Sequence, residues 1–416
     1  MFSQYFPPEV GATQIRLEVF ARTLADAGHD VTVIAEVPNH PSGTIPPEWR
    51  GRFVHRTAEQ GYEVLRVWVY TSPRKSFWRR LAFYLTYSIN AIVVALTMIR
   101  RRPDVVFASS PPLPVLTSAL VTATLWHRPF VIDIRDLWPA IGVALDELRG
   151  RRAVRLAQAL ERLLYRRAAA VVCVTQGFVE HVVAEGAAPS KVHLLPNGTL
   201  PDVFRPDCHD SMLRSRLGLG QDAFVVGYVG LHGIAQGLHA LLDAAALLGD
   251  EPGIRFLFVG DGPIKGELIA AAAARGLDNV VFADQVAVEA APKFINACDV
   301  MVVPLRRLNL LQTFVPSKIF DYLACAKPVV IMADGEARRL VEESGTGVFV
   351  EPEDPYGLAR AVVSLRNDPT ALKAMGALAR PFVCRSFDRQ KIAPRLERIL
   401  VDVAARNDPG GPQTGH

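Results

Sequence analysis

Cysteine is scarce in this sequence, and several short catalytic patterns are absent from it. The chain of 416 residues has five cysteines, widely spaced and odd in number: Cys173, Cys208, Cys298, Cys325 and Cys384. This usage is typical of reduced core residues in a cytoplasmic protein and argues against a disulfide framework. Cys-x-x-Cys, Gly-x-Ser-x-Gly and Walker A patterns do not occur, which argues against a zinc or redox protein, a serine hydrolase and a nucleotide triphosphatase.

Charge is limited as well. The chain has 46 Lys and Arg against 42 Asp and Glu, so the net charge is only +4, and 21% of the residues are charged. A balance so close to neutral indicates no nucleic-acid partner. Half of the residues are hydrophobic, which is the composition of a globular protein. The first eight residues contain no basic segment, so we expect no secretory signal and a cytoplasmic location.

Short apolar runs rich in Val and Ile alternate with longer helical patterns along the chain. A first series of strands is predicted at 31–35, 64–69, 104–108, 130–134 and 170–175, and a second at 224–230, 254–260, 279–283, 299–304 and 328–332. This alternation predicts an α/β fold in which two doubly wound parallel-sheet domains follow one another.

Length and turn residues predict the domain boundaries. A chain of this length favours two domains of roughly 200 residues each. We expect a first domain over 1–200, a second over 201–380, a helix over 381–405 that returns to the first domain, and a disordered tail over 406–416. Residues 194–210, with an Asn-Gly turn and three prolines, are either the linker or an ordinary loop. Because so few residues precede the first loop, we expect the first strand to begin upstream of Met1.

Each predicted domain opens with a strand, a glycine-bearing loop and a helix. Gly11 precedes a helix over 14–27, which Gly28 is expected to end in a left-handed conformation. Gly230 and Gly233 precede a helix over 238–248. Glycines let backbone amides approach a ligand, so both loops are candidate phosphate sites. A later segment, GDGPIKG, resembles a dinucleotide fingerprint but has one residue too many before its last glycine.

The segment PSKIFDYLACAKPVV, residues 316–330, has the composition of a helix that holds a nucleotide. Pro316 or Ser317 is expected to open the helix and Pro328 to stop it after residue 327. Ser317, Lys318 and Asp321 lie near one another in the first turns, where free amides and a lysine attract phosphate and a carboxylate accepts from a ribose diol. An amphipathic helix with a capping serine and solvated charges fits the same residues. In either case four residues are expected to pack inward: Ile319, Phe320, Leu323 and Ala324.

In their order and spacing, the motifs of this chain resemble those of the retaining glycosyltransferases of family 4, which have the two-domain GT-B fold. The similarity is greatest to bacterial exopolysaccharide and O-antigen transferases of the fucosamine transferase and colanic acid type. It implies two Rossmann-like domains facing a cleft, with the acceptor bound by the first and the nucleotide sugar by the second. The segments that carry it are SQYFPPEVGATQIR (3–16), AGHDVTVI (27–34), IRDLWP (134–139), GYVGLHGIAQGL (227–238), VGDGP (259–263) and VPSKIFDYLACAKPVV (315–330).

The chain departs from this family at its donor signature, which has two glutamates separated by seven residues. Thr313 stands at the first position and Asp321 at the second. The resemblance assigns the Asp321 carboxylate to the ribose hydroxyls. Thr313 cannot supply the charged contact of the first glutamate to the sugar, so the identity of the sugar cannot be inherited from the family.

A second departure concerns the cations that bind the diphosphate. Many relatives place an arginine and a lysine after the second glycine loop, where this chain has Leu231 and Gln236. The resemblance therefore leaves Lys318 and Lys265 as candidate phosphate ligands, and Lys265 as a plain solvated lysine is an equal alternative. Backbone amides near three glycines are expected to assist: Gly11, Gly230 and Gly233.

Asp133, Arg135 and Asp136 end a predicted strand, at the edge where open α/β sheets bind ligands. They are candidate catalytic residues that orient the acceptor hydroxyl or bind its phosphate. The alternative prediction is that Arg135 and Asp136 form a structural ion pair beside Trp138. Ser109 stands where several relatives carry a histidine. Since the chain contains no Asp-x-Asp, we expect no metal site, and the resemblance implies a front-side displacement in which the donor phosphate helps to deprotonate the acceptor.

The run LAFYLTYSINAIVVALTMI, residues 81–99, carries no charge and is flanked by arginines at 79, 80 and 100–102. Its length could just span a bilayer, but predicted strands of one sheet lie on either side of it. We therefore expect a helix of the first domain. It either lies on an anionic membrane surface, aided by Phe77, Trp78, Phe83 and Tyr84, or is fully packed as a crossover helix.

These patterns together predict an enzyme without a cofactor, a hexosyl- or N-acetylhexosaminyl-transferase. Its partners are a nucleotide-sugar donor, expected to be UDP-linked, and a saccharide or lipid-linked acceptor. We expect it in the cytoplasm, with an anionic membrane surface as a further partner. A nucleotide-sugar epimerase of the same fold is the alternative enzyme, and a non-catalytic binding module is a third.

Overall fold

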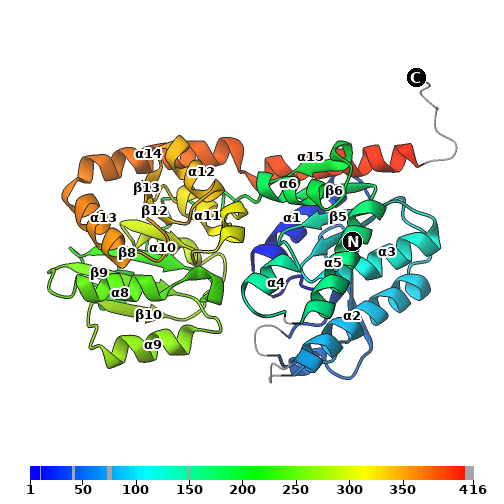
Figure 1. Cartoon of the computed structure of the whole chain (residues 1–416), viewed down its shortest axis with the longest axis horizontal. Coiled ribbons are helices and arrows are strands. Elements are labelled where there is room, and N and C mark those ends of the chain that lie inside the picture. Colours follow the sequence, from blue (N-terminus) through cyan, green and yellow to red (C-terminus); the bar gives the residue numbers. More distant parts are fainter. Residues whose placement is uncertain (10, 40–42, 73–76, 149, 408–416) are drawn as a thin grey trace. The chain divides into compact units, whose positions relative to one another are not determined.

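The chain forms two compact units in the structure, a computed structural model that describes residues 1–9, 11–39, 43–72, 77–148 and 150–407. The first unit comprises Met1–Pro196 and Gln390–His416, and the second comprises Asn197–Arg389 (Figure 1). The chain passes into the second unit after Pro196, close to the boundary predicted after residue 200. It returns to the first unit after Arg389, later than the boundary predicted after residue 380, because a helix of the second unit extends to Ser386.

Strands and one N-terminal residue form the sheet layer of the first unit. Phe2 makes parallel bridges to Ile34 and Ala108 and so connects strands ordered β1-β3-β2 with strands ordered β4-β5-β6-β7. The pairs are parallel except for β2 with β3. The strands are β1 (Thr32–Glu36), β2 (Val54–Ala58), β3 (Glu63–Val67), β4 (Val106–Ser110), β5 (Phe130–Ile134), β6 (Ala170–Cys173) and β7 (Val192–Leu194).

Helices pack on this sheet in two groups. Side chains of α1 and α15, among them Leu17, Phe20 and Leu396, share a core with Val33 and Val131 of the strands. A separate group is formed by α3, which contacts both α2 and α5. The helices of the unit are α1 (Ala12–Asp26), α2 (Phe77–Met98), α3 (Leu113–Trp126), α4 (Ala140–Ala144), α5 (Arg151–Arg167), α6 (Gln176–Ala184) and α15 (Arg389–Arg406), with short 3-10 turns η1 (Pro47–Trp49) and η2 (Pro189–Lys191).

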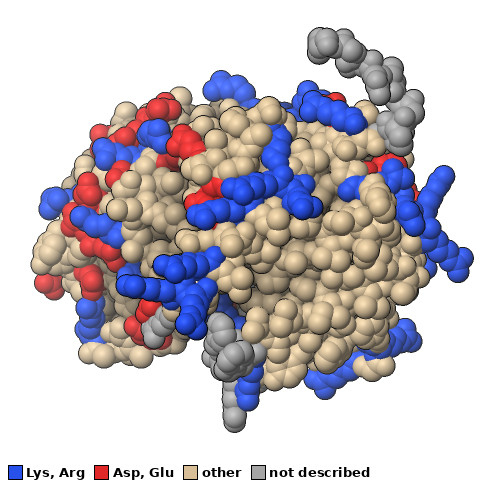
Figure 2. All heavy atoms as spheres, turned by 45° about the vertical axis from the view of Figure 1, so that its right-hand side comes forward, with Lys and Arg blue, Asp and Glu red and all other residues tan. Residues whose placement is uncertain are grey.

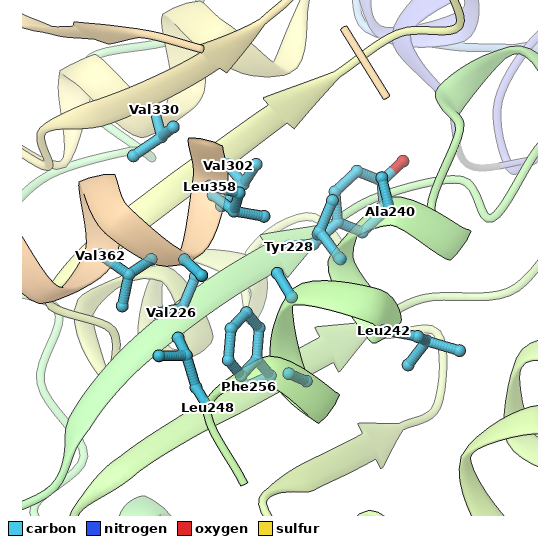
Figure 3. Close-up of a cluster of buried hydrophobic side chains, with 14 of the residues drawn as sticks. Val226, Tyr228, Ala240, Leu242, Leu248, Phe256, Val302, Val330, Leu358 and Val362 are labelled. Atoms are coloured by element: carbon cyan, nitrogen blue, oxygen red, sulfur yellow. The ribbon is translucent and has the colours of Figure 1, made fainter. Parts of the chain in front are cut away.

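The sheet of the second unit is wholly parallel, in the order β10-β9-β8-β11-β12-β13. Its central strands are buried along nearly their whole length, which is why the sequence shows continuous Val, Ile and Phe runs there. Figure 3 shows Tyr228 and Phe256 of this sheet packed with Leu358 and Val362 of helix α13. The strands are β8 (Phe224–Val229), β9 (Ile254–Val259), β10 (Val280–Ala283), β11 (Val300–Pro304), β12 (Val329–Met332) and β13 (Gly347–Phe349).

Helices follow most of these strands in alternation. They are α7 (Leu213–Arg216), α8 (His239–Leu247), α9 (Lys265–Ala274), α10 (Ala291–Asn296), α11 (Lys318–Ala324), α12 (Glu336–Ser344), α13 (Pro355–Asn367) and α14 (Pro369–Ser386), with 3-10 turns η3 (Ile234–Gln236) and η4 (Asn309–Thr313). The order of strands, with β8 next to β11, is that of a doubly wound dinucleotide-type fold. The predicted α/β class is therefore confirmed.

Two predicted boundaries, the end of the first helix and the start of the C-terminal tail, can be compared with the structure. The predicted helix end at Gly28 is confirmed: Gly28 has a φ of 89°, and the amide of His29 donates to the Leu24 carbonyl. The predicted disordered tail begins too early, since Arg406 still belongs to α15. Residues 408–416 of that tail lie outside the described residues.

Candidate active site

The candidate donor site of the second unit lies where its strand order reverses. Strands β8 and β11 are neighbours in the sheet, but their connections run to opposite sides. Ligands of open α/β sheets bind at the carboxyl ends of such strands. The loop Gly230–Gly237 follows β8, and the segment that leads to α11 follows β11, so the two predicted donor elements meet at this crevice.

Lys318, the first residue of α11, contacts the glycine loop directly. Its ammonium donates to the Tyr228 hydroxyl and lies 4.0 Å from the centroid of the Tyr228 ring. A Cβ placed on Gly230 would lie 3.2 Å from Nζ, and the φ of 149° at this position is one that residues with a Cβ rarely adopt. Burial lowers the pKa of Lys318 to about 7. Among the described residues Lys318 has no ion-pair partner, so its charge is available to an anion.

Helix α11 is shorter than the sequence predicts. It ends at Ala324, not at Lys327, because Ala326 turns left-handed with a φ of 55° and the amide of Lys327 donates to the Tyr322 carbonyl. Ser317 is the N-terminal flanking residue, but its side chain makes no capping hydrogen bond. A helix of 7 residues has a weak dipole, so Lys318 and the glycine loop are left as the main attraction for phosphate.

The inward-facing residues of α11 are as predicted. Ile319, Phe320, Leu323 and Ala324 are all buried. Tyr322 adds a link that the sequence did not reveal: its hydroxyl donates to the Val229 carbonyl at 2.7 Å and accepts from the Val229 amide at 2.8 Å. The end of β8 and the start of the glycine loop are thereby fixed to α11.

A second glycine pair supports the loop from the next strand. Gly260 and Gly262 follow β9 with φ values of 137° and 158°. A Cβ on Gly260 would lie 2.1 Å from the Gly230 carbonyl oxygen, and one on Gly262 would lie 2.4 Å from the His232 carbonyl oxygen. The backbone of the Gly-Asp-Gly segment, residues 260–262, therefore packs directly against the backbone of the loop 230–237, called here the donor loop.

Two of the predicted donor glycines have no such constraint. Gly233 precedes η3 with an ordinary φ of −99°, and Gly11 precedes α1 with an extended backbone. A Cβ at either position would meet the flexible end of a nearby glutamine, Gln236 or Gln14. Their predicted part in donor binding rests on their amides alone and stays a prediction.

His232 lies at the base of the donor loop and is fully buried. Its ring stands 5.7 Å from the Tyr228 ring and 6.3 Å from the Phe258 ring, and neither ring nitrogen has a hydrogen-bond partner. Burial, reinforced by Lys265 and Lys318, lowers the pKa of His232 to about 4, while Asp261 and the Val259 backbone act in the opposite direction. The imidazole is therefore neutral near pH 7.

The other candidate cation, Lys265, is already occupied. Its ammonium donates to the Asp284 carboxylate at 2.7 Å and to the Ala283 carbonyl at 3.2 Å, at the end of β10. Asp284 is almost fully exposed, so this ion pair is weak and could be exchanged for a phosphate. Lys265 as a phosphate ligand remains a prediction.

Thr313 and Asp321 stand at the two acidic positions of the family signature. The Thr313 hydroxyl donates to the Leu310 carbonyl at 2.8 Å, within the same 3-10 turn. The Asp321 carboxylate accepts from the Thr199 hydroxyl at 2.7 Å. Burial raises the pKa of Asp321 to about 6, and Arg389 and Thr199 oppose the rise.

Asp321 is thus tied to both segments that connect the units. The amide of Thr199 donates to the Phe387 carbonyl, and the amide of Arg389 donates to the Thr199 carbonyl. The Thr199 hydroxyl occupies Oδ1 of Asp321, and a carboxylate has further acceptor positions for a ribose diol. Thr199 was not among the predicted site residues.

Asp133 in the first unit has both carboxylate oxygens engaged. One accepts from the Arg16 guanidinium at 3.2 Å and the other from the Ser109 hydroxyl at 2.9 Å, and all three side chains are buried. Arg16 also donates to the carbonyls of Leu195 and Pro196. This arrangement favours a structural role, in which Asp133 anchors α1 to β5, over the predicted catalytic one.

Arg135 and Asp136 are partly exposed neighbours at the same sheet edge. Burial raises the pKa of Asp136 to about 6, against the opposing charge of Arg135. Nε and Nη1 of Arg135 have no hydrogen-bond partner among the described residues, and the charges of Asp133 and Asp136 act on its guanidinium. Both remain candidates for contact with the acceptor.

The described residues contain no group of three or more His, Cys, Asp or Glu side chains placed to hold a metal ion. Their polar groups instead form a cation and amide site in the second unit, and in the first unit a carboxyl group, Asp136, next in sequence to the guanidinium of Arg135. The first suits a diphosphate and the second suits a hydroxyl or an anionic acceptor.

Comparison with known proteins defines the class of this arrangement. Residues 11–198 match the model of a glycosyl transferase 4-like domain, and residues 223–368 match that of the glycosyl transferases group 1. The two matches cover most of both units. The protein is a glycosyltransferase of the GT-B fold. Within that class, residues 11–198 belong to the glycosyl transferase 4-like domains and residues 223–368 to the glycosyl transferases group 1.

Individual relatives agree with this assignment. Over 391 residues the chain is 27% identical to WcaI of Escherichia coli (strain K12), which is named for colanic acid biosynthesis, covering 91% of this chain and 93% of WcaI. Sucrose-phosphate synthase of Thermosynechococcus elongatus matches with a TM-score of 0.76 at 20% identity, covering 97% and 98% of the two chains. Anabaena HepE, solved in complex with UDP-glucose, matches with a TM-score of 0.71 at 19% identity, covering 96% and 98%. The two structural matches show the fold.

Proposed function

We propose that this glycosyltransferase moves a hexosyl or N-acetylhexosaminyl group from a UDP-linked donor to a lipid-linked saccharide, with retention of configuration, in cell-surface polysaccharide synthesis. The observation that carries the proposal is the ammonium of Lys318, which has no ion-pair partner among the described residues and lies against Gly230 at the switch point of the second sheet. HepE, a protein of the same fold, is solved with UDP-glucose. WcaI, which aligns over most of the chain, is named for the synthesis of colanic acid.

The proposed reaction breaks the bond between the anomeric carbon and the donor phosphate. The acceptor oxygen attacks from the same face, and its proton passes to the departing phosphate oxygen. Negative charge grows on the diphosphate in the transition state, and Lys318 with the amides after Gly230 stabilises that charge. Asp321 positions the ribose, and Arg135 with Asp136 positions the acceptor.

Release of UDP in the presence of an acceptor tests this proposal. Nucleotide sugars are first screened for thermal stabilisation of the protein, because a ligand that binds only the folded state raises its apparent stability. The stabilising donor is then incubated with and without a lipid-linked saccharide extract. We expect UDP release that depends on the acceptor, and NMR spectra in which the product keeps the anomeric configuration of the donor.

Other outcomes would identify other functions. An inverted anomeric configuration would contradict retention. Formation of free UDP and an epimeric sugar without any acceptor would favour the nucleotide-sugar epimerase, for which neither family model gives support.

A further inference from the structure

The outer surface of helices α2, α3 and α5 in the first unit combines exposed apolar side chains with arginine. Among the described residues, helix α2 is long and apolar enough to cross a membrane. However, only 28% of its most apolar 18-residue stretch is buried within the protein. Its buried side is fixed in the fold: Tyr87 is fully buried and its hydroxyl donates to the Ile34 carbonyl of β1 at 2.9 Å. Helix α2 is therefore a packed helix with one uncovered side, and the same contacts exclude it from spanning a bilayer.

The uncovered side of α2 carries a continuous apolar stripe. Leu85, Ile89, Val93 and Leu96 follow one another at intervals of three or four residues and so share one face of the helix. They are between 41% and 58% exposed. The neighbouring helix α3 adds Leu125, which is 52% exposed. An isolated exposed leucine needs no explanation, but a stripe of this length indicates a partner.

Helix α5 adds a face of a different kind. Arg152, Arg155, Leu156 and Leu163 are all exposed and fall near one side of the helix. Leu156 is 73% exposed, the most exposed of the large hydrophobic side chains described. A helix with arginines and leucines mixed on its solvent side is typical of a segment that lies in the interface of a bilayer.

Acidic side chains are missing from the exposed faces of these three helices, and two described carboxylates near them, Asp104 and Glu147, are paired with Arg128 and Arg80. Neither α2 nor α3 contains Asp or Glu. The one carboxylate of α5, Glu161, is buried and accepts from Tyr165 and pairs with His181. Arginines 100–102 follow α2 directly. In Figure 2 a broad surface without charged side chains lies on the right-hand side, with Lys and Arg around its margin.

We infer that this α2–α3–α5 face binds the surface of a bilayer that contains anionic lipid. The apolar stripe enters the boundary between headgroups and acyl chains, and the arginines of α5 and of residues 100–102 attract the negative headgroups. The absence of exposed carboxylates on the three helices complements that charge. This inference concerns a surface of the first unit and does not depend on the proposed donor or acceptor.

Co-sedimentation with lipid vesicles tests the inference on the full chain. We expect wild-type protein to bind vesicles of phosphatidylcholine mixed with phosphatidylglycerol at low salt and to bind pure phosphatidylcholine vesicles much less. High salt should release most of the bound protein, because the Debye length shortens from about 30 Å at 0.01 M to about 3 Å at 1 M. Wild-type protein that stays in the supernatant with anionic vesicles at low salt would overturn the inference.

Two variants separate the apolar and the electrostatic contributions. Ile89→Asp should abolish binding to either kind of vesicle, since it places a carboxylate in the middle of the stripe. Arg152→Gln with Arg155→Gln should weaken binding to the anionic vesicles about fivefold per arginine removed. The matched control is Leu378→Asp with Arg385→Gln on α14 of the second unit, where Leu378 is 52% exposed. This control should bind vesicles as wild type does.

Three results would contradict the inference. Equal loss in the control would mean that the named face is not responsible. Equal and salt-independent binding to neutral vesicles would mean that the arginines do not recognise the lipid. A dimer in sedimentation that Ile89→Asp dissociates, without any vesicle binding by wild type, would assign the face to a second copy of the chain.

Discussion

The ammonium of Lys318 is the residue on which donor binding depends most. Burial against Tyr228, with no ion-pair partner in the described chain, lowers its pKa to about 7. A bound diphosphate favours the charged form and raises this pKa, so binding takes up a proton wherever the free lysine is neutral. Affinity for a UDP-sugar should fall by up to roughly tenfold per pH unit above about pH 7.

Calorimetric titration of a UDP-sugar in buffers of different ionisation enthalpy measures this proton uptake. His232 and Asp321, with pKa values of about 4 and 6, have finished titrating above pH 7 and do not contribute. In the variant Lys318→Arg the side chain stays charged, so the pH dependence should disappear. Affinity of wild-type protein that is independent of pH between about 7 and 8.5 would contradict the prediction.

Asp133 and Asp136 are three residues apart in sequence but have different roles: Asp133 is the buried counter-charge of Arg16, and Asp136 is a candidate for contact with the acceptor. Replacing Asp133 with Asn leaves the buried Arg16 guanidinium without its counter-charge, which should lower the free energy of unfolding of the first unit by about 3 kcal/mol. Asp136 is partly exposed and half-neutral near pH 6, so Asp136→Asn should change stability by less than about 1 kcal/mol while reducing transfer.

Urea unfolding of the full-length variants, followed by the transfer assay, separates these two roles. Wild-type stability in Asp133→Asn would show that the Arg16 ion pair is not structural. A loss of stability in Asp136→Asn as large as that in Asp133→Asn would remove Asp136 as a candidate for contact with the acceptor.

At the scale of elements, the donor loop after β8 depends on its contact with the loop after β9. Gly260→Ala places a Cβ 2.1 Å from the Gly230 carbonyl oxygen at a φ of 137°. The clash and the strained backbone should together cost about 3 kcal/mol of stability and weaken binding of UDP by at least tenfold if the loop shifts. Both changes are measurable by thermal unfolding with and without UDP.

Gly266 provides the matched control in the same segment. It lies in the first turn of α9, and a Cβ there would meet nothing within 4 Å. Gly266→Ala should leave UDP binding unchanged and raise stability by about 0.5 to 1 kcal/mol, since alanine is the better helix former. Unchanged UDP binding in Gly260→Ala would show that the two loops are not coupled.

The central strands could be predicted from the sequence because parallel strands buried on both faces are nearly continuous apolar runs. Strand β2 could not, since Val54–Ala58 is polar and pairs at the edge in the antiparallel sense. The 3-residue strands β7 and β13 are too short to show a pattern. The end of α11 was also wrong, because a left-handed Ala326 carries no sequence signal as a glycine would.

The predicted site residues are brought together only in part. Lys318 and Gly230 do meet, but the partners that define their chemistry come from distant positions: Tyr228 is 90 residues from Lys318, and Thr199 is 122 residues from Asp321. No local pattern encodes such pairs. A buried tyrosine in the strand before a glycine loop was the one available signal for Tyr228.

At the scale of the whole molecule, the two units have separate hydrophobic cores. One core is built from α1, α15 and the strands of the first unit, and the other from α8, α13 and the strands of the second. The predicted diphosphate ligands that the structure brings together, Lys318 and the loop after Gly230, all belong to the second unit. Binding of UDP should therefore slow hydrogen exchange mainly in that unit.

Hydrogen–deuterium exchange of the full chain, with and without UDP, measures whether Lys318 and the loop after Gly230 bind the diphosphate. We predict slower exchange in the loop 230–237 and in the first turn of α11, and loss of both effects in Lys318→Met while exchange elsewhere in the second unit stays as in wild type. Protection confined to other segments, or equal protection in Lys318→Met, would contradict this prediction.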